Sequence, residues 1–342
     1  MQDDSLLLLK GSEIDNILRN REQDLMDAVK LAYQVHANKQ THMPPNSYLR
    51  FPGMEKERII AKAAFLGGSF DTAGLKWIAS FPNNLSKGIE RASATLILNS
   101  SETGRPTAIM ESSIISAKRT AASAALAAQV MYPEEQLQAA GMVGCGLINF
   151  ETLRFLLAAY PSMEHLHLFD LSTERAQQFK NKALRLKSNL NVQIESSFDA
   201  LLKNAPVISF GTTAVHPFID SLDGHLPHAV ILHISLRDLK PGVILGADNV
   251  VDDIEQVCSN KTSLHLAEMQ AGNRNFIRSA IGDIFNGHAA PYSQENKLHI
   301  FSPFGLGILD MALAHYVDQQ ARVQGVGTLI ENFLPNAWMD RD

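Results

Sequence analysis

The stretch "AAGMVGCGLINFETLRFLL", residues 139–157, decides the fold class of this chain. Its first residues are small and apolar, which predicts a buried strand, and the segment 147–160 has the pattern of a helix. Gly144 and Gly146 lie between them, as in a tight turn whose following helix receives a phosphate at its N-terminus. The third glycine of a dinucleotide turn is absent, and Asn149 stands there. The turn alone leaves two interpretations open, a dinucleotide site or a plain strand-to-helix turn.

Strand and helix patterns alternate on both sides of this turn, from about residue 129 to residue 305. Alternation at this spacing predicts a Rossmann-type doubly wound parallel sheet with right-handed crossovers. The expected strands after the turn are 165–170, 192–196, 206–213, 229–236 and 247–253, with a charged helix at 173–188.

The rest of the chain predicts a second domain of α+β type with an antiparallel sheet, so the fold class is α/β with two domains. An Ala-rich helix at 112–131 would join the domains, and a helix at 305–325 would return to the first one. The expected domains are therefore a discontinuous unit of 1–128 with 306–342, and a nucleotide-binding domain of 129–305. The first unit's expected elements are a helix at 22–39 and extended segments at 46–51, 57–67, 73–81 and 93–99.

Composition places the chain among globular proteins. It has 342 residues, of which 45% are hydrophobic and 19% charged, and a net charge of −6 that disfavours nucleic acid as a partner. The apolar runs are too short for a membrane span, and the acidic start does not resemble an export signal. Cys145 and Cys258 are the two cysteines, which fits a cytoplasmic location, and no cysteine–histidine spacing predicts a metal site.

Further residues strengthen the dinucleotide interpretation. Asp170 ends the next expected strand, where a carboxylate accepts hydrogen bonds from both ribose hydroxyls. Leu171 and Ser172 follow it, and the lack of an arginine there favours NAD over NADP. In the alternative interpretation Asp170 only neighbours a helix cap and Gly211 is a turn glycine. The predicted NAD-binding residues are Gly144, Gly146, Leu147, Ile148, Asp170, Thr212, Thr213 and Ser235.

Four basic residues of the first domain occur inside otherwise apolar patterns: Arg50, Lys76, Arg91 and Arg119. Taken singly, each would be interpreted as a salt-bridge partner, or as a side chain whose aliphatic part covers apolar surface. Together they indicate an anionic substrate with two or three carboxylates, because the guanidinium fork matches a carboxylate and lysine supplies a point charge.

Asp238 follows the expected strand 229–236, at the end of the sheet where the reactive ring of a nicotinamide cofactor would lie. A carboxylate there could act as a general base on an amine or on water. It could equally be an ordinary turn aspartate ahead of Lys240 and Pro241, and spacing alone does not separate these interpretations.

Over nearly its whole length the sequence resembles the ornithine cyclodeaminase/μ-crystallin family. The resemblance is carried by "GLKWIAS", "RTAASAALAA", "VGCG", the strand-terminal Asp170, Asp238 after "HIS", and "PFGLGILD" at 303–310. It is closest to the branch that forms 2,3-diaminopropionate for siderophores and related peptides, through three segments: "YLR" at 48–50, "SKGIERAS" at 86–93 and "LILN" at 96–99.

The resemblance implies a homodimer, built through its first domain, which performs NAD-linked amine chemistry. In this branch N-(1-amino-1-carboxy-2-ethyl)glutamate is oxidised with NAD and the imine is hydrolysed to 2,3-diaminopropionate, 2-oxoglutarate and NADH. By position, Arg50, Lys76 and Arg119 would bind carboxylates, and Asp238 would deprotonate the amine or activate water. Lys76 could also protonate the departing amine. Arg91 is added to these carboxylate-binding cations from the residue pattern and not from the resemblance.

Three alternatives stay open at this point. An ornithine cyclodeaminase would recycle NAD and release ammonia, whereas a cyclic-imine reductase or amino-acid dehydrogenase would use the same apparatus on another substrate. A non-catalytic binding protein is the third alternative, since the crystallin relatives imply that this fold permits one. The departure from the family pattern at Asn149 predicts a slightly altered cofactor affinity.

Overall fold

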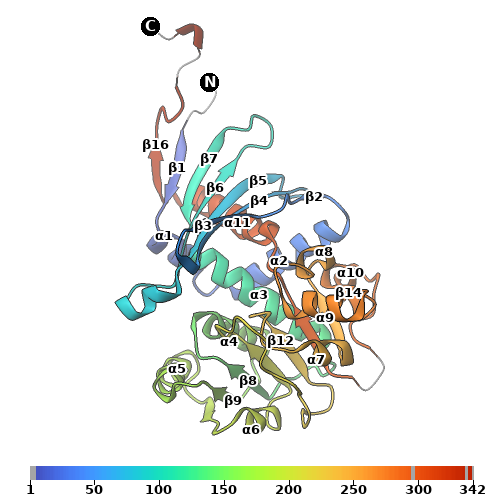
Figure 1. Cartoon of the computed structure of the whole chain (residues 1–342). Helices are drawn as coiled ribbons and strands as arrows, with labels where there is room; N and C mark the ends of the chain where they lie inside the picture. The colour runs from blue at the N-terminus through green and yellow to red at the C-terminus, as the bar shows by residue number, and fades with distance from the viewer. Residues whose placement is uncertain (1–4, 294–296, 336–337, 341–342) are drawn as a thin grey trace. The chain divides into compact units, whose positions relative to one another are not determined.

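The computed structural model describes residues 5–293, 297–335 and 338–340. The chain forms two compact units, which are described separately (Figure 1). Unit 1 comprises residues 1–21, 38–119 and 307–342, and unit 2 comprises residues 22–37 and 120–306. The boundary between them falls inside α3 (Ser113–Met131), the Ala-rich helix expected to join the domains.

Unit 2 is built on an eight-stranded sheet in which every pair of neighbouring strands is parallel. The chain runs outward from β8 (Ala139–Val143) to β9 (His165–Phe169) and β10 (Asn191–Ile194), then crosses back to place β11 (Val207–Phe210) on the other side of β8. This reversal is the switch point of a doubly wound fold, so the predicted Rossmann-type sheet is confirmed. In spatial order the strands are β10 (Asn191–Ile194), β9 (His165–Phe169), β8 (Ala139–Val143), β11 (Val207–Phe210), β12 (Val230–His233), β15 (His299–Ser302), β13 (Asp248–Val251) and β14 (Ile277–Ala280).

Helix α2 (Glu22–Ala37) belongs to unit 2, whereas the sequence placed it with the first domain. It packs closely on α10 (Ile281–Phe285). The approach is so close that a Cβ added to Gly282 would lie 2.5 Å from the carbonyl oxygen of Tyr33. Gln34 Nε2 also donates to the carbonyl of Phe285 at 3.2 Å. The other helices of unit 2 are α4 (Leu147–Ala159), α5 (Thr173–Leu186), α6 (Phe198–Leu202), α7 (Pro241–Gly246), α8 (Ile254–Val257), α9 (Ser263–Ala271) and α10 (Ile281–Phe285).

Unit 1 contains a second eight-stranded sheet, which is antiparallel except where β1 pairs with β7. Helix α11 (Gly307–Gln324) lies against β4, β5 and β6, which buries one face of that sheet. The strands are β16 (Thr328–Ile330), β1 (Leu6–Leu9), β7 (Pro106–Glu111), β6 (Ala92–Asn99), β5 (Thr72–Ser80), β4 (Met54–Leu66) and β2 (Thr41–His42), with β3 (Ser47–Phe51) beside β4; α1 (Gly11–Leu18) and the 3-10 turns η1 (Pro82–Lys87) and η2 (Trp338–Asp340) complete the unit.

Strands β1, β2, β7, β14, β15 and β16 were not expected from the sequence. They have two to six residues, and such segments carry little periodicity of their own. They become strands through their neighbours: β15, for example, pairs with β12 on one side and β13 on the other. No helix in the described parts of the chain combines the length and apolarity that a membrane crossing requires.

Candidate active site

The turn after β8 has the geometry that a phosphate requires. Gly144 has a φ of 89°, in the left-handed region that favours glycine. Gly146 is the N-cap of α4, and no side chain forms a capping hydrogen bond there. The backbone N–H groups of the first helical turn, beginning at Leu147 and Ile148, therefore have no capping partner. This helix end can therefore hold an anion.

Asp170, the residue after β9, binds the backbone of that turn. Its carboxylate accepts from the backbone N–H of Cys145 at 2.7 Å and from that of Ser172 at 2.8 Å. The predicted cofactor acid thus also fixes the backbone between the two glycines. Burial raises the pKa of the neighbouring Cys145 thiol to about 12, so that thiol stays protonated and is not a nucleophile.

Asp238 is fully buried at the carboxyl end of the sheet, and its two oxygens have three donors. The Thr212 hydroxyl donates to Oδ1 and the Ser235 hydroxyl donates to Oδ2. His233 Nε2 lies 3.2 Å from Oδ2. Burial alone would raise the pKa of Asp238, but the bonds from His233, Ser235 and Thr212 outweigh burial and lower it. The carboxylate therefore stays ionised at neutral pH.

These contacts change the interpretation of two predicted cofactor residues. The hydroxyls of Thr212 and Ser235 hold the Asp238 carboxylate in place, while Thr213 is exposed beside them. Sequence reasoning missed His233, whose other ring nitrogen lies 3.2 Å from the Ser302 hydroxyl. The sequence did contain a signal for His233: it ends the buried strand β12, five residues before Asp238.

Unit 1 contains a buried ionic cluster around Asp310, which lies in the first turn of α11. Lys76 Nζ lies 2.6 Å from Asp310 Oδ2, and Arg119 Nε lies 3.3 Å from Oδ1. The Ser116 hydroxyl accepts from Lys76 Nζ at 3.1 Å. The structure therefore brings Lys76 and Arg119 together and adds a carboxylate that sequence reasoning did not assign to the site.

Burial lowers the pKa of Lys76 to about 7, against the opposing effect of the Asp310 charge. The charges of Arg119 and Lys62 lower it further. An amine that titrates near neutrality can gain and lose a proton during turnover, which an ordinary lysine cannot. In the same cluster burial alone would raise the pKa of Asp310, but the charges of Lys76 and Arg119 lower it.

Further cations share a face of the sheet with Lys76, since residues directly opposite in paired strands project to the same side. Lys62 stands opposite Lys76 in the β4–β5 ladder, and Arg58 lies on the same face of β4. Arg50 stands opposite Arg58 in the β3–β4 ladder. Arg58 and Lys62 were not predicted, although their even spacing in one strand is a signal for a shared face.

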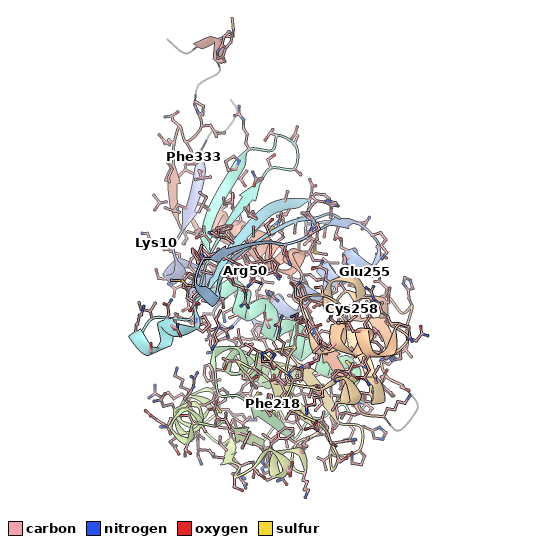
Figure 2. All side chains as sticks on the ribbon, in the orientation of Figure 1. Lys10, Arg50, Phe218, Glu255, Cys258 and Phe333 are labelled. Carbon is pink, nitrogen blue, oxygen red and sulfur yellow. The ribbon has the colours of Figure 1, made fainter. Side chains whose placement is uncertain are left out.

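The two remaining predicted arginines lie near Arg58. Arg50, which is labelled in Figure 2, is exposed. Its guanidinium carbon lies 5.8 Å from the centre of the Tyr48 ring. Arg91 precedes β6, and burial together with the charge of Arg58 lowers its pKa. The four predicted cations therefore lie in two groups, Lys76 with Arg119 at Asp310 and Arg50 with Arg91 near Arg58.

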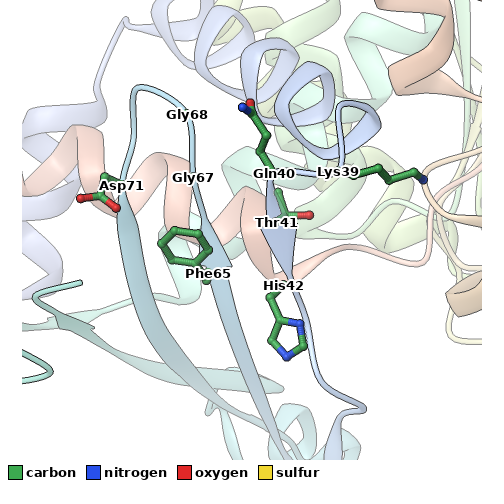
Figure 3. A pocket seen from close by; sticks show the side chains of 8 residues that line it. All are labelled: Lys39, Gln40, Thr41, His42, Phe65, Gly67, Gly68 and Asp71. Atoms are coloured by element: carbon green, nitrogen blue, oxygen red, sulfur yellow. The ribbon is translucent and has the colours of Figure 1, made fainter. Parts of the chain in front are cut away.

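A separate pocket of about 440 Å³ lies at the end of β4 (Figure 3). None of the predicted site residues lines it. Its walls come from Lys39, Gln40, Thr41, His42, Phe65, Gly67, Gly68 and Asp71. No group of three metal-ligating side chains occurs among the residues that the structure describes.

The comparisons with known proteins agree with this architecture. Residues 8–325 match the ornithine cyclodeaminase/mu-crystallin family. The N-((2S)-2-amino-2-carboxyethyl)-L-glutamate dehydrogenase of Staphylococcus aureus is 29% identical over 331 residues, which is 95% of this chain and 98% of that protein.

Two solved structures are similar over nearly the whole chain. An archaeal alanine dehydrogenase dimer with bound NAD has a TM-score of 0.85 and 26% identity, covering 96% of this chain and 100% of that one. The Δ(1)-pyrroline-2-carboxylate reductase of Thermococcus litoralis, solved with NADH and L-proline, has a TM-score of 0.86 and 20% identity, covering 94% and 99%.

Proposed function

The chain belongs to the ornithine cyclodeaminase/mu-crystallin family, and from this premise we propose that it is an NAD-dependent oxidoreductase acting on a CH–NH bond. The observation that carries the proposal is the buried cluster of Lys76 and Arg119 around Asp310, on the same sheet face as three further cations. Such a concentration of positive charge fits a substrate with several carboxylates.

The residues at the turn after β8 fit NAD. Gly144 permits the tight turn, and the uncapped start of α4 suits a pyrophosphate. Asp170 suits the two ribose hydroxyls. When bound, NAD supplies the hydride acceptor. The NAD-bound archaeal alanine dehydrogenase supports this assignment.

The substrate that we propose is N-(1-amino-1-carboxy-2-ethyl)glutamate. Oxidation at the glutamate α-carbon gives an imine and NADH, and water then cleaves the imine to 2,3-diaminopropionate and 2-oxoglutarate. The balanced reaction consumes one NAD⁺ and one water and releases one proton. The likeness to the dehydrogenase of Staphylococcus aureus supports this substrate, which would serve siderophore or peptide biosynthesis. We also propose a homodimer, as in the archaeal relative.

We assign roles to the site residues according to their charge. Arg50, Arg91 and Arg119 would bind substrate carboxylates, and Lys76 would do so in its protonated form. Lys76 would also donate a proton to the departing amine, since its pKa is near 7. Asp238, which stays ionised, would accept a hydrogen bond from the substrate nitrogen and later from the attacking water.

The test is to incubate the protein with NAD and a panel of N-substituted glutamates and diamino acids while following NADH absorbance. Net NADH from the glutamate adduct, with 2-oxoglutarate as co-product, is the expected result. An ornithine cyclodeaminase would release ammonia from ornithine with no net NADH. An amino-acid dehydrogenase would form NADH from alanine or another simple amino acid, and either outcome would replace the proposed substrate.

A further inference from the structure

The side chain of Asn149 is fully buried beneath the turn after β8. Its Nδ2 lies within hydrogen-bond distance of three backbone carbonyl oxygens, at 3.0 Å from Val143, 2.7 Å from Gly144 and 3.2 Å from Ser209. Its Oδ1 accepts from the Ser209 hydroxyl at 2.8 Å. Both ends of the amide are therefore satisfied, and the partners belong to β8 with its turn and to β11.

The loop after β11 packs tightly against the Asn149 amide. A Cβ added to Gly211 would lie 2.7 Å from Asn149 Cγ and Oδ1, closer than real atoms approach. A Cβ on Gly144 would lie 2.8 Å from the carbonyl oxygen of Gly211. The backbone of Gly211 also donates to the Val143 carbonyl at 2.9 Å. The asparagine thus occupies the space that a side chain at position 211 would need.

We propose that Asn149 is a positioning residue that fastens the cofactor turn after β8 to the loop after β11, and that it thereby requires glycine at position 211. The inference rests on the proposed binding of NAD. Ligands of doubly wound sheets bind outside the carboxyl ends of the strands at the switch point, which here lies between β8 and β11. Because the Asn149 hydrogen bonds already hold these two loops together, binding NAD does not have to order them, and this favours a higher affinity for NAD.

Asn249 provides a matched control. It is also fully buried in unit 2, and its Nδ2 reaches three carbonyl oxygens, at 2.7 Å from Ile244, 3.1 Å from Ala247 and 3.1 Å from Phe276. It lies in β13, which β11, β12 and β15 separate from β8 in the sheet. Removing this amide disturbs a similar set of bonds away from the cofactor turn.

The experiment compares the single variants N149A, G211A and N249A with the double variant N149A/G211A. NAD affinity is measured by titration calorimetry, stability by thermal unfolding, and turnover at saturating NAD. We expect N149A to weaken NAD binding about ten-fold, as loss of a buried hydrogen-bond network does, with kcat changed by less than about two-fold. N249A should lower the unfolding temperature and leave NAD affinity unchanged.

The second arm tests the steric coupling by comparing the effect of G211A in the unmodified and N149A backgrounds. G211A alone should weaken NAD binding and lower the unfolding temperature, because alanine collides with Asn149. In the N149A background the same substitution should cost much less in both measurements. Unchanged NAD affinity in N149A, or an equal effect of G211A in both backgrounds, would overturn the inference. Failure of the unmodified protein to bind NAD would instead overturn the proposed function beneath it.

Discussion

Lys76 Nζ and Asp310 Oδ2 lie 2.6 Å apart, and both side chains have no exposed surface. β5 supplies the lysine and the first turn of α11 supplies the carboxylate. A buried pair of this kind contributes little net stability, but removing one partner leaves an uncompensated charge. The Asp310 charge also raises the pKa of Lys76, against the larger lowering by burial, and so helps the lysine keep its proton.

Replacing Asp310 with asparagine should reduce stability and change the pH dependence of catalysis. We expect the free energy of unfolding to fall by about 3 kcal/mol, since two cations lose their buried counter-ion. The pKa of Lys76 should fall further, so the high-pH loss of kcat/KM moves to lower pH. The control is D318N on the same helix, whose partner Arg322 is largely exposed and which should change neither quantity.

The unmodified protein should lose kcat/KM as pH rises through about 7. The ammonium of Lys76 is fully formed below its lowered pKa and is lost above it, and the neutral amine no longer attracts a substrate carboxylate. In K76R the guanidinium stays charged throughout this range, so kcat/KM should become independent of pH near 7, although its value should be lower than in the unmodified protein. A K76R enzyme whose kcat/KM falls over the same pH range would show that another group titrates.

Replacing Asp238 with asparagine should strongly reduce turnover and leave cofactor binding intact. We expect kcat to fall by about 100-fold to 10,000-fold, with Kd for NAD changed by less than about two-fold. D248N is a suitable control, because Asp248 is also a buried carboxylate, paired with Arg278 and His299. It should affect stability alone. An Asp238→Asn enzyme with full turnover would remove Asp238 from the chemistry.

The exposed Arg50 should contribute to substrate binding rather than to folding. We expect R50A to raise KM for the tricarboxylate substrate about ten-fold, as loss of one charge-assisted contact does, with unchanged affinity for NAD. R50K should recover only part of the loss, since lysine lacks the bidentate fork. R19A serves as the control, because Arg19 is exposed at the C-cap of α1 and pairs with Asp15 of that helix.

Asp170 should determine both cofactor affinity and the choice between NAD and NADP. D170N keeps an oxygen for the Cys145 N–H but removes the negative charge that repels a 2′-phosphate. We expect KM for NAD to rise about ten-fold and the preference over NADP to narrow. Steady-state kinetics with both cofactors check this, and an unchanged ratio would show that other residues set the preference.

The sequence by itself determined the parallel α/β fold of unit 2, the turn at Gly144 and Gly146, and Asp170 and Asp238 as strand-end acids. These features depend on residues close together in the chain, where periodicity and turn chemistry are readable. It also pointed to Lys76 and Arg119 as unusual cations in apolar surroundings. It did not find the strands whose pairing comes from distant neighbours.

Only the tertiary structure decided which of these residues meet. The pairing of Lys76 with Asp310 depends on α11 returning to the first sheet, and the face shared by Arg50 and Arg58 depends on strand register. The role of Asn149 depends on β11 lying next to β8. Contacts between distant segments follow from packing and register, which leave no local pattern in the chain, and a carboxylate or amide has its chemistry set by those contacts.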